Sequence, residues 1–251
     1  MGERTFPLRM IAWELTRNCN LSCVHCRASA ASGPHEGELS TEECRRIIDD
    51  ILSFSEPTVI LTGGEPLLRP DIFDIIEYGN GRGLRLVIAI NGTLLDIEKA
   101  HRLKASGIKR VSLSIDGKDR KGHDSFRGVD GSFGAVIRAT QIFKDIVLPF
   151  QINTTVTRLN VDDLGEIYKL VRSLGAAAWH IFLLVPVGRG TGLKGSELSA
   201  KTYEDVLHWL YGVEKRNEIE MKVTCAPHYY RIVKEKGDTP KSAGCLAGKS
   251  F

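Results

Sequence analysis

Runs of β-forming residues alternate with amphipathic helical stretches along most of this chain, and this alternation constrains the fold more than any other feature. From Met10 onward, each strand-like run is followed by a helix-like stretch. Strands that alternate with helices pair in parallel through crossover connections. The sequence therefore predicts an α/β fold built on a parallel sheet. The strand-like runs are MIAWEL, TVILT, LRLVIAI, RVSLSI, FQINTTV and WHIFLLV.

The number of strand–helix units sets the extent of this sheet. A closed eightfold barrel typically takes about 250 residues, and this chain of 251 residues shows six units. We therefore expect a partial (β/α)6 TIM-like open barrel with a short C-terminal extension. Residues 1–220 would form the barrel, and residues 221–251, which open with the short strand-like run MKVT, would form the extension. Site residues of such barrels lie at the C-terminal ends of the strands.

The first helix has a clear start signal. Ser40 and Glu43 match the capping-box pattern, in which each residue satisfies a backbone N–H of the other. Cys44 falls on the apolar face of this helix, so we interpret it as a structural residue.

Composition narrows the function classes. The net charge is +3 with 26% charged residues, which does not indicate a nucleic-acid-coating surface. No run approaches the roughly 18 apolar residues that span a bilayer, so we expect a soluble cytoplasmic protein with no membrane partner. Three of the six cysteines lie within eight residues and no secretory signal precedes them, which favours metal or redox chemistry over a disulfide scaffold.

Cys19, Cys23 and Cys26 follow the first strand-like run directly. Cysteine thiolates are the usual ligands of iron–sulfur clusters, and three of them would leave one iron of a [4Fe–4S] cluster open for catalysis. The alternative is a structural zinc site that adds His25 or His35. The one-residue step from His25 to Cys26 makes ligation by both awkward.

The segment CNLSCVHC resembles the CxxxCxxC pattern of radical S-adenosylmethionine (SAM) enzymes. Residues 62–66 resemble the GGEP motif of that family, which implies SAM binding by Gly63, Gly64, Glu65 and Pro66. In isolation the motif would favour a simple turn in which Pro66 starts a helix. Its occurrence together with the cysteine triplet favours the SAM site.

Further segments resemble the family in the expected order. Those containing Asn91, Ser114 and Asp116 end strand-like runs, although Asn-Gly and Asp-Gly also form turns. Arg127 is a candidate bidentate partner of a carboxylate of SAM or substrate, or else a solvated surface residue. The resemblance implies SAM contacts by Asn91, Ser114, Asp116, Arg127, Asn153 and Val185.

Two features depart from the family pattern or extend beyond the barrel. His25 stands where an aromatic residue commonly precedes the last cluster cysteine, and its imidazole can still pack against adenine. Cys225 and Cys245 resemble the opening cysteines of a SPASM- or twitch-like auxiliary region, which carries additional clusters. Two thiolates cannot complete a cluster, so we expect that the sequence ends inside this region, with an auxiliary cluster in the full-length protein. The alternative is that both are buried small hydrophobes.

Within the family, this sequence most resembles enzymes of alternative haem and haem d1 biosynthesis. The segments that carry this resemblance are residues 9–28, VPVGRG and TCAPHYYRI. The resemblance implies a [4Fe–4S] cluster, SAM, a low-potential donor such as a ferredoxin or flavodoxin, and a tetrapyrrole substrate. Arg127 and Arg189 are candidates for gripping its carboxylates. The runner-up is a SPASM-type peptide maturase. An alternative of another class is a non-catalytic zinc- or iron-binding module.

Overall fold

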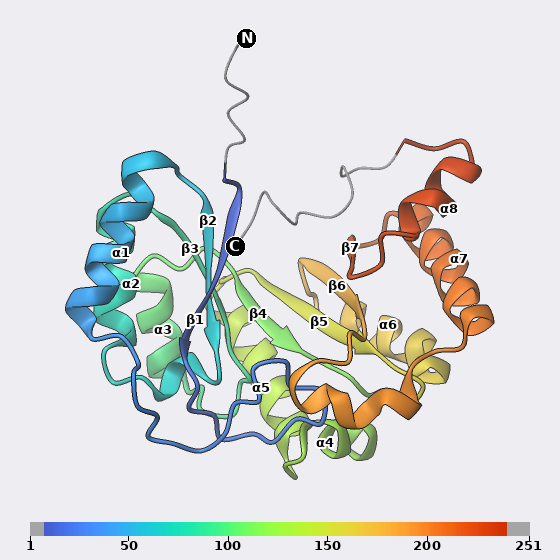
Figure 1. Ribbon diagram of the computed structural model, residues 1–251, viewed down its shortest axis with the longest axis horizontal. Helices are drawn as coiled ribbons and strands as arrows, with labels where there is room; N and C mark the ends of the chain where they lie inside the picture. The colour runs from blue at the N-terminus through green and yellow to red at the C-terminus, as the bar shows by residue number, and fades with distance from the viewer. Residues whose placement is uncertain (1–7, 240–251) are drawn as a thin grey trace.

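The computed structural model describes residues 8–239, which form one curled seven-stranded sheet with helices around its outside (Figure 1). All neighbouring strands pair in parallel, and their spatial order is their order in the chain. The α/β partial barrel predicted from the sequence is therefore confirmed. The strands are β1 (Met10–Thr16), β2 (Thr58–Gly63), β3 (Arg85–Ala89), β4 (Val111–Ser114), β5 (Phe150–Val156), β6 (Ala178–Leu183) and β7 (Glu220–Thr224).

Helices connect these strands and cover the convex face of the sheet. Two short helices, α4 and α8, were not separated in the sequence. The α-helices are α1 (Thr41–Phe54), α2 (Ile72–Gly81), α3 (Ile97–Ala105), α4 (Arg120–Arg127), α5 (Ser132–Asp145), α6 (Leu164–Ser173), α7 (Ala200–Arg216) and α8 (Tyr229–Glu235), with 3-10 turns at Pro66–Leu68, Val161–Asp163 and Gly188–Ser196.

The expected extension contributes a seventh strand to the sheet. The run MKVT, which we placed in the extension, lies in β7 and pairs along its length with β6. Short strands with mixed polar and apolar residues give a weak signal, so pairing with an existing sheet edge decides their structure. The boundary expected at residue 220 falls on the first residue of β7, and the division into two domains stays a prediction.

Side chains alternate between the two sides of each strand, so the sheet has two chemically different faces. Leu113, Ile152 and Trp179 are fully buried on the face that packs against the helices, and each such side chain contributes about 1.5–3 kcal/mol by leaving water. The intervening residues face the concave side, called here the lumen. Many of those on β4 to β7 are polar, so the sequence of these strands fixes a chemically distinct inner wall.

The start of α1 confirms the sequence analysis. The Ser40 hydroxyl accepts a hydrogen bond from the Glu43 N–H at 3.3 Å, and the Glu43 carboxylate accepts one from the Ser40 N–H at 2.8 Å. Cys44 is fully buried in the core.

None of the helices in residues 8–239 is both long and apolar enough to cross a membrane.

Candidate functional site

The cysteine loop, defined here as residues 17–31, leaves the end of β1 and runs along the edge where the other strands also end (Figure 1). Cys19 and Cys23 are buried and Cys26 is half-buried. Burial raises the pKa of the Cys19 thiol, and the nearby charges of Cys23, Glu65 and Cys26 raise it further. The three predicted ligands therefore lie near one another, beside the glutamate of the GGEP segment.

The donor set at this loop consists of soft thiols. Within residues 8–239, no group of three or more His, Cys, Asp or Glu side chains is arranged to hold a single metal ion. A cuboidal cluster binds each thiolate through a different iron, so its ligands do not have to meet at one point. Two buried nitrogen atoms beside the thiols, Nδ1 of His25 and Nε of Arg127, have no hydrogen-bond partner among the described residues.

The GGEP segment is pressed against the start of the cysteine loop. The N–H of Gly64 donates to the Thr16 carbonyl at 2.6 Å, and the N–H of Glu65 donates to the Asn18 carbonyl at 2.8 Å. A Cβ on Gly64 would lie 2.1 Å from the Asn18 oxygen, and Gly63 has a φ of +131°. Both positions require glycine, because any side chain would push the two segments apart.

Glu65 is fully buried and joins the segment to the end of β3. Its Oε1 accepts from the Leu67 N–H at 3.0 Å and its Oε2 accepts from the Asn91 N–H at 2.6 Å. Burial raises its pKa to about 7, against the two hydrogen bonds, which lower it. The side chain thus ties the GGEP segment to the neighbouring strand and keeps a titratable group beside the thiols.

The Asn91 side chain continues the same network to the cysteine loop. It donates to the Asn20 side chain at 2.8 Å, and Asn20 in turn donates to the Thr93 hydroxyl at 2.7 Å. Asn20 and Thr93 were not among the predicted site residues. Neither had a signal of its own, because polar residues in loops are common.

Asp116 and Arg127 form a buried ion pair below the cysteine loop. Burial alone would raise the pKa of Asp116, but the Arg127 charge lowers it below its usual range. The Asp116 Oδ1 also accepts from the Thr155 N–H at 2.7 Å. The Arg127 Nη1 lies 3.6 Å from the Cys23 sulfur. Arg127 is therefore not the solvated surface residue of the alternative interpretation.

Helix α4 supports the loop through its C-terminal end. The Ser22 N–H donates to the Arg127 carbonyl at 3.2 Å, and the Val24 N–H donates to the Phe126 carbonyl at 3.1 Å. The His25 ring packs on Phe126 with 4.5 Å between centroids. Burial, with a contribution from the Arg127 charge, lowers the pKa of His25 to about 4, so this imidazole is neutral at pH 7.

The segment after β6 is hydrogen-bonded to the loop through Arg189. Nε of Arg189 donates to the Cys23 carbonyl at 2.9 Å, its Nη1 donates to the Ala30 carbonyl, and its N–H donates to the Cys26 carbonyl at 2.9 Å. These contacts use the guanidinium to hold the cysteine loop, whereas the sequence had suggested a grip on substrate. Val185, in the same segment, is 49% exposed.

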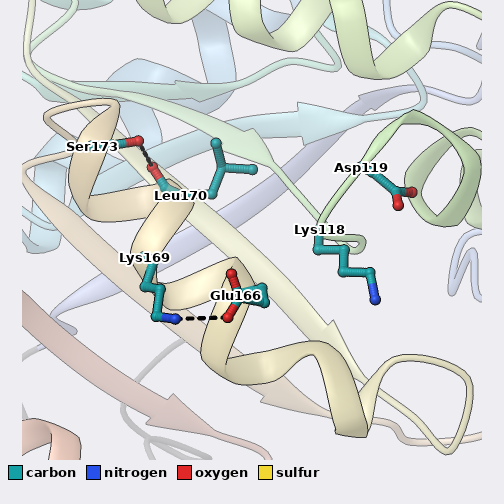
Figure 2. A pocket seen from close by; sticks show the side chains of 6 residues that line it. All are labelled: Lys118, Asp119, Glu166, Lys169, Leu170 and Ser173. Atoms are coloured by element: carbon teal, nitrogen blue, oxygen red, sulfur yellow. Dashed lines mark hydrogen bonds and ion pairs between the residues drawn. The ribbon is translucent and has the colours of Figure 1, made fainter.

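The remaining predicted residues are placed as follows. Ser114 and Asn153 are neighbours in register across β4 and β5. Cys225 directly follows β7 and is exposed, and Cys245 lies outside the described residues. A pocket beside α6 is lined by no residue of the cysteine loop (Figure 2). Its lining residues are Lys118, Asp119, Glu166, Lys169, Leu170 and Ser173.

A parallel partial barrel with three thiols at the carboxyl edge, beside a glycine-dependent backbone contact, has the architecture of a radical SAM enzyme. The Radical SAM superfamily profile matches residues 13–171. The chain belongs to this family and is an enzyme that uses a [4Fe–4S] cluster and SAM. Family membership replaces the alternative of a non-catalytic metal-binding module.

The relatives include two proteins of high similarity. The AdoMet-dependent heme synthase of Nitratidesulfovibrio vulgaris is 46% identical over 97% of this chain and 70% of its own length. The protein of the same name from Methanosarcina barkeri is 45% identical over 97% of this chain and 73% of its own. AdoMet is another abbreviation of SAM.

Among solved structures, Streptococcus suis SuiB bound to SAM aligns with a TM-score of 0.76 over 92% of this chain and 53% of SuiB. At 18% identity, this likeness shows the fold alone.

Proposed function

We propose that this enzyme modifies a side chain of a tetrapyrrole, for example by oxidative decarboxylation of a propionate group. The observation that carries this proposal is the 46% identity, over 97% of the chain, to a protein named AdoMet-dependent heme synthase. The second heme synthase supports it at 45% identity. The likeness to SuiB concerns the fold, so it does not favour a peptide substrate.

We propose that Cys19, Cys23 and Cys26 hold the cluster. Their thiols fit an iron–sulfur group by donor chemistry, and the guanidinium of Arg127, 3.6 Å from the Cys23 sulfur, supports an anionic group there. When bound, the reduced cluster and SAM supply a 5′-deoxyadenosyl radical that abstracts a substrate hydrogen. The chain's own residues position both groups and exclude water.

The SAM site is proposed next to this loop, on the motifs that contact it. Gly63 and Gly64 let the GGEP segment pack directly against the backbone at the start of the cysteine loop. Asp116 and Arg127 keep each other in place, so the guanidinium can turn one edge to the SAM carboxylate. The proposed SAM-binding residues are Gly63, Gly64, Glu65, Pro66, Asn91, Ser114, Asp116, Arg127, Asn153 and Val185.

Three further proposals concern the setting of the reaction. Electrons would come from a low-potential donor such as a ferredoxin or flavodoxin, because the [4Fe–4S] cluster must be reduced for the reaction with SAM. A reducing cytoplasm suits the unpaired thiols of the cysteine loop. Cys225 and Cys245 remain proposed ligands of an auxiliary cluster.

The proposed function is tested by product mass. The chain, with its cluster reconstituted under anaerobic conditions, is incubated with SAM, dithionite and a porphyrin that carries propionate groups. The proposal predicts a product that has lost CO2 and two hydrogens per modified side chain, one hydrogen to 5′-deoxyadenosine and one as a proton, with one SAM consumed as the net oxidant. Release of 5′-deoxyadenosine with no change in any tetrapyrrole, and a change of mass in a peptide substrate, would contradict it and favour the maturase.

A further inference from the structure

Four polar residues form a row across the lumen wall. Ser114, Asn153, His180 and Lys222 are direct register partners on the adjacent strands β4, β5, β6 and β7. Register partners on parallel strands point to the same face of a sheet. Three strand spacings of about 4.8 Å separate the ends of the row by roughly 14 Å. The row therefore joins two proposed SAM contacts to a lysine near the open edge of the sheet.

The side chains behind this row confirm its direction. Trp179 and Ile181 flank His180 and are fully buried against the helices, and Val223 next to Lys222 is buried as well. Alternation then places His180 and Lys222 on the lumen face. The half-buried Phe182 occupies the next lumen position of β6. The wall thus combines a polar row with an apolar surface.

Gln151 fixes the orientation of His180. Its Nε2 donates to the Asn153 Oδ1 at 3.0 Å and lies 3.0 Å from the His180 Nδ1. Because the amide nitrogen is a donor, Nδ1 acts as acceptor, and the proton of the neutral ring sits on Nε2. Burial first, and then the charges of Lys222 and Arg110, lower the pKa of His180 to about 4. The ring is neutral at pH 7 and presents an N–H donor.

The charge on this wall is positive and incompletely balanced. Arg110 pairs with Glu220 at 3.4 Å, and Glu220 is the nearest acidic residue along β7 on the same face. Lys222 forms no ion pair with a carboxylate in the part of the chain that the structure describes, residues 8–239. At the next lumen-facing position of β7, the buried Thr224 hydroxyl lacks a hydrogen-bond partner among the same residues. These groups are donors that an acceptor-rich ligand would satisfy.

We propose that Lys222 and His180 anchor a carboxylate of the substrate in the lumen. Lys222 supplies the charge, His180 supplies a directed N–H, and the Thr224 hydroxyl lies beside them. A ligand held at this end places a second side chain toward Ser114 and Asn153, where the proposed SAM site begins. The inference rests on the proposed function, because a propionate-bearing tetrapyrrole has several carboxylates on one rigid frame. The inference places carboxylate binding on the lumen wall, because the guanidinium of Arg189 is hydrogen-bonded to the cysteine loop.

The test compares two ligands that differ in the charge of their side chains, coproporphyrin III and its methyl ester. Each is titrated by fluorescence quenching into the cluster-reconstituted chain in the presence of SAM. The variants are Lys222→Met, which removes the charge, and Lys222→Arg, which keeps it. Lys169→Met is the matched control, because this lysine lies outside the lumen, on α6 at the pocket of Figure 2. Circular dichroism melting shows that each variant is folded.

The wild type is expected to bind the acid more tightly than the ester. Lys222→Met should weaken binding of the acid about tenfold or more, the order expected for one charge-assisted hydrogen bond, and leave binding of the ester unchanged. Lys222→Arg and Lys169→Met should still bind the acid more tightly than the ester. If folded Lys222→Met binds the acid as the wild type does, or if the wild type binds acid and ester equally, the anchor is overturned while the tetrapyrrole function stands. If the wild type binds neither porphyrin, both proposals are overturned.

Discussion

The guanidinium of Arg127 lies 3.6 Å, measured from Nη1, from the sulfur of Cys23. The same guanidinium is paired with the buried carboxylate of Asp116. A residue 104 positions away in sequence thus places a positive charge on one of the proposed cluster ligands. Hydrogen bonds and charges at cluster sulfurs are among the factors that set the reduction potential.

Replacing Arg127 with Met is expected to have two effects. Stability should fall by about 3–5 kcal/mol, because Asp116 would be left as an unpaired buried charge. The midpoint potential of the bound cluster should become more negative, because a cation beside Cys23 favours the reduced, more negative state. Urea unfolding and an anaerobic EPR titration measure the two quantities. The double variant Arg127→Met/Asp116→Asn should recover part of the stability, because no unpaired charge is left buried; an unchanged potential in Arg127→Met would contradict the role of the cation.

Removal of any one loop cysteine should abolish cluster binding. Cys19→Ala, Cys23→Ala and Cys26→Ala are each expected to lose most of their iron and sulfide after reconstitution, since two thiolates cannot hold the cluster. Cys44→Ala is the matched control: its thiol is buried in the core of the sheet and α1, so iron content should not change. Full iron and sulfide in a loop variant would show that this cysteine is not a ligand.

The glycine requirement at the GGEP segment can be tested against a helical glycine. Gly64→Ala places a methyl group 2.1 Å from the Asn18 oxygen, which is backbone and cannot swing away. We expect a stability loss of about 1–3 kcal/mol and weaker SAM binding in an equilibrium binding assay. Gly212→Ala, in the exposed part of α7 with no atom within 4 Å of the new methyl group, should be neutral or stabilising by up to about 1 kcal/mol. Equal effects of the two substitutions would refute the close-contact argument.

Stability of the cluster-free protein should fall as the pH falls from 6.5 to about 4. His123 is buried, and burial lowers its pKa to about 4, with the Arg127 charge contributing. Its Nδ1 accepts a hydrogen bond from the Asp116 N–H at 3.2 Å. Between these pH values the unfolded chain binds a proton that the folded chain does not, so acid favours unfolding by about 2–3 kcal/mol for this group.

The measurement is the free energy of unfolding at several pH values, for the wild type and for His123→Gln. The amide of Gln can accept from the Asp116 N–H but does not titrate, so the slope between pH 6.5 and 4 should be smaller in the variant. Identical slopes would mean that His123 is not held neutral in the folded state.

The sequence predicted the features that are local and missed those that depend on distant segments. Capping by Ser40 and Glu43 and the strand periodicity follow from neighbouring residues, and both were confirmed. The place of Glu220–Thr224 in the sheet could not be predicted, because it comes from pairing with β6. The charge of Arg189 made it a candidate for binding substrate carboxylates, whereas its hydrogen bonds to the carbonyls of Cys23 and Ala30 depend on the fold.

The lumen row could not be predicted from the sequence for the same reason, because it depends on distant segments. His180 and Lys222 lie 42 positions apart, and only the register of β6 and β7 makes them neighbours. A single histidine in an apolar strand and a single lysine in a short one carry no distinctive signal. The motifs that contact the cysteine loop were found individually by resemblance, whereas their convergence on one loop required the fold.

The most direct test of the central claim is 5′-deoxyadenosine release by the anaerobically reconstituted, dithionite-reduced chain given SAM, beside the triple variant Cys19→Ala/Cys23→Ala/Cys26→Ala. Release is expected from the wild-type chain and none from the triple variant. Equal release by both, or none from a wild-type chain shown to contain a [4Fe–4S] cluster and bound SAM, would contradict the central claim.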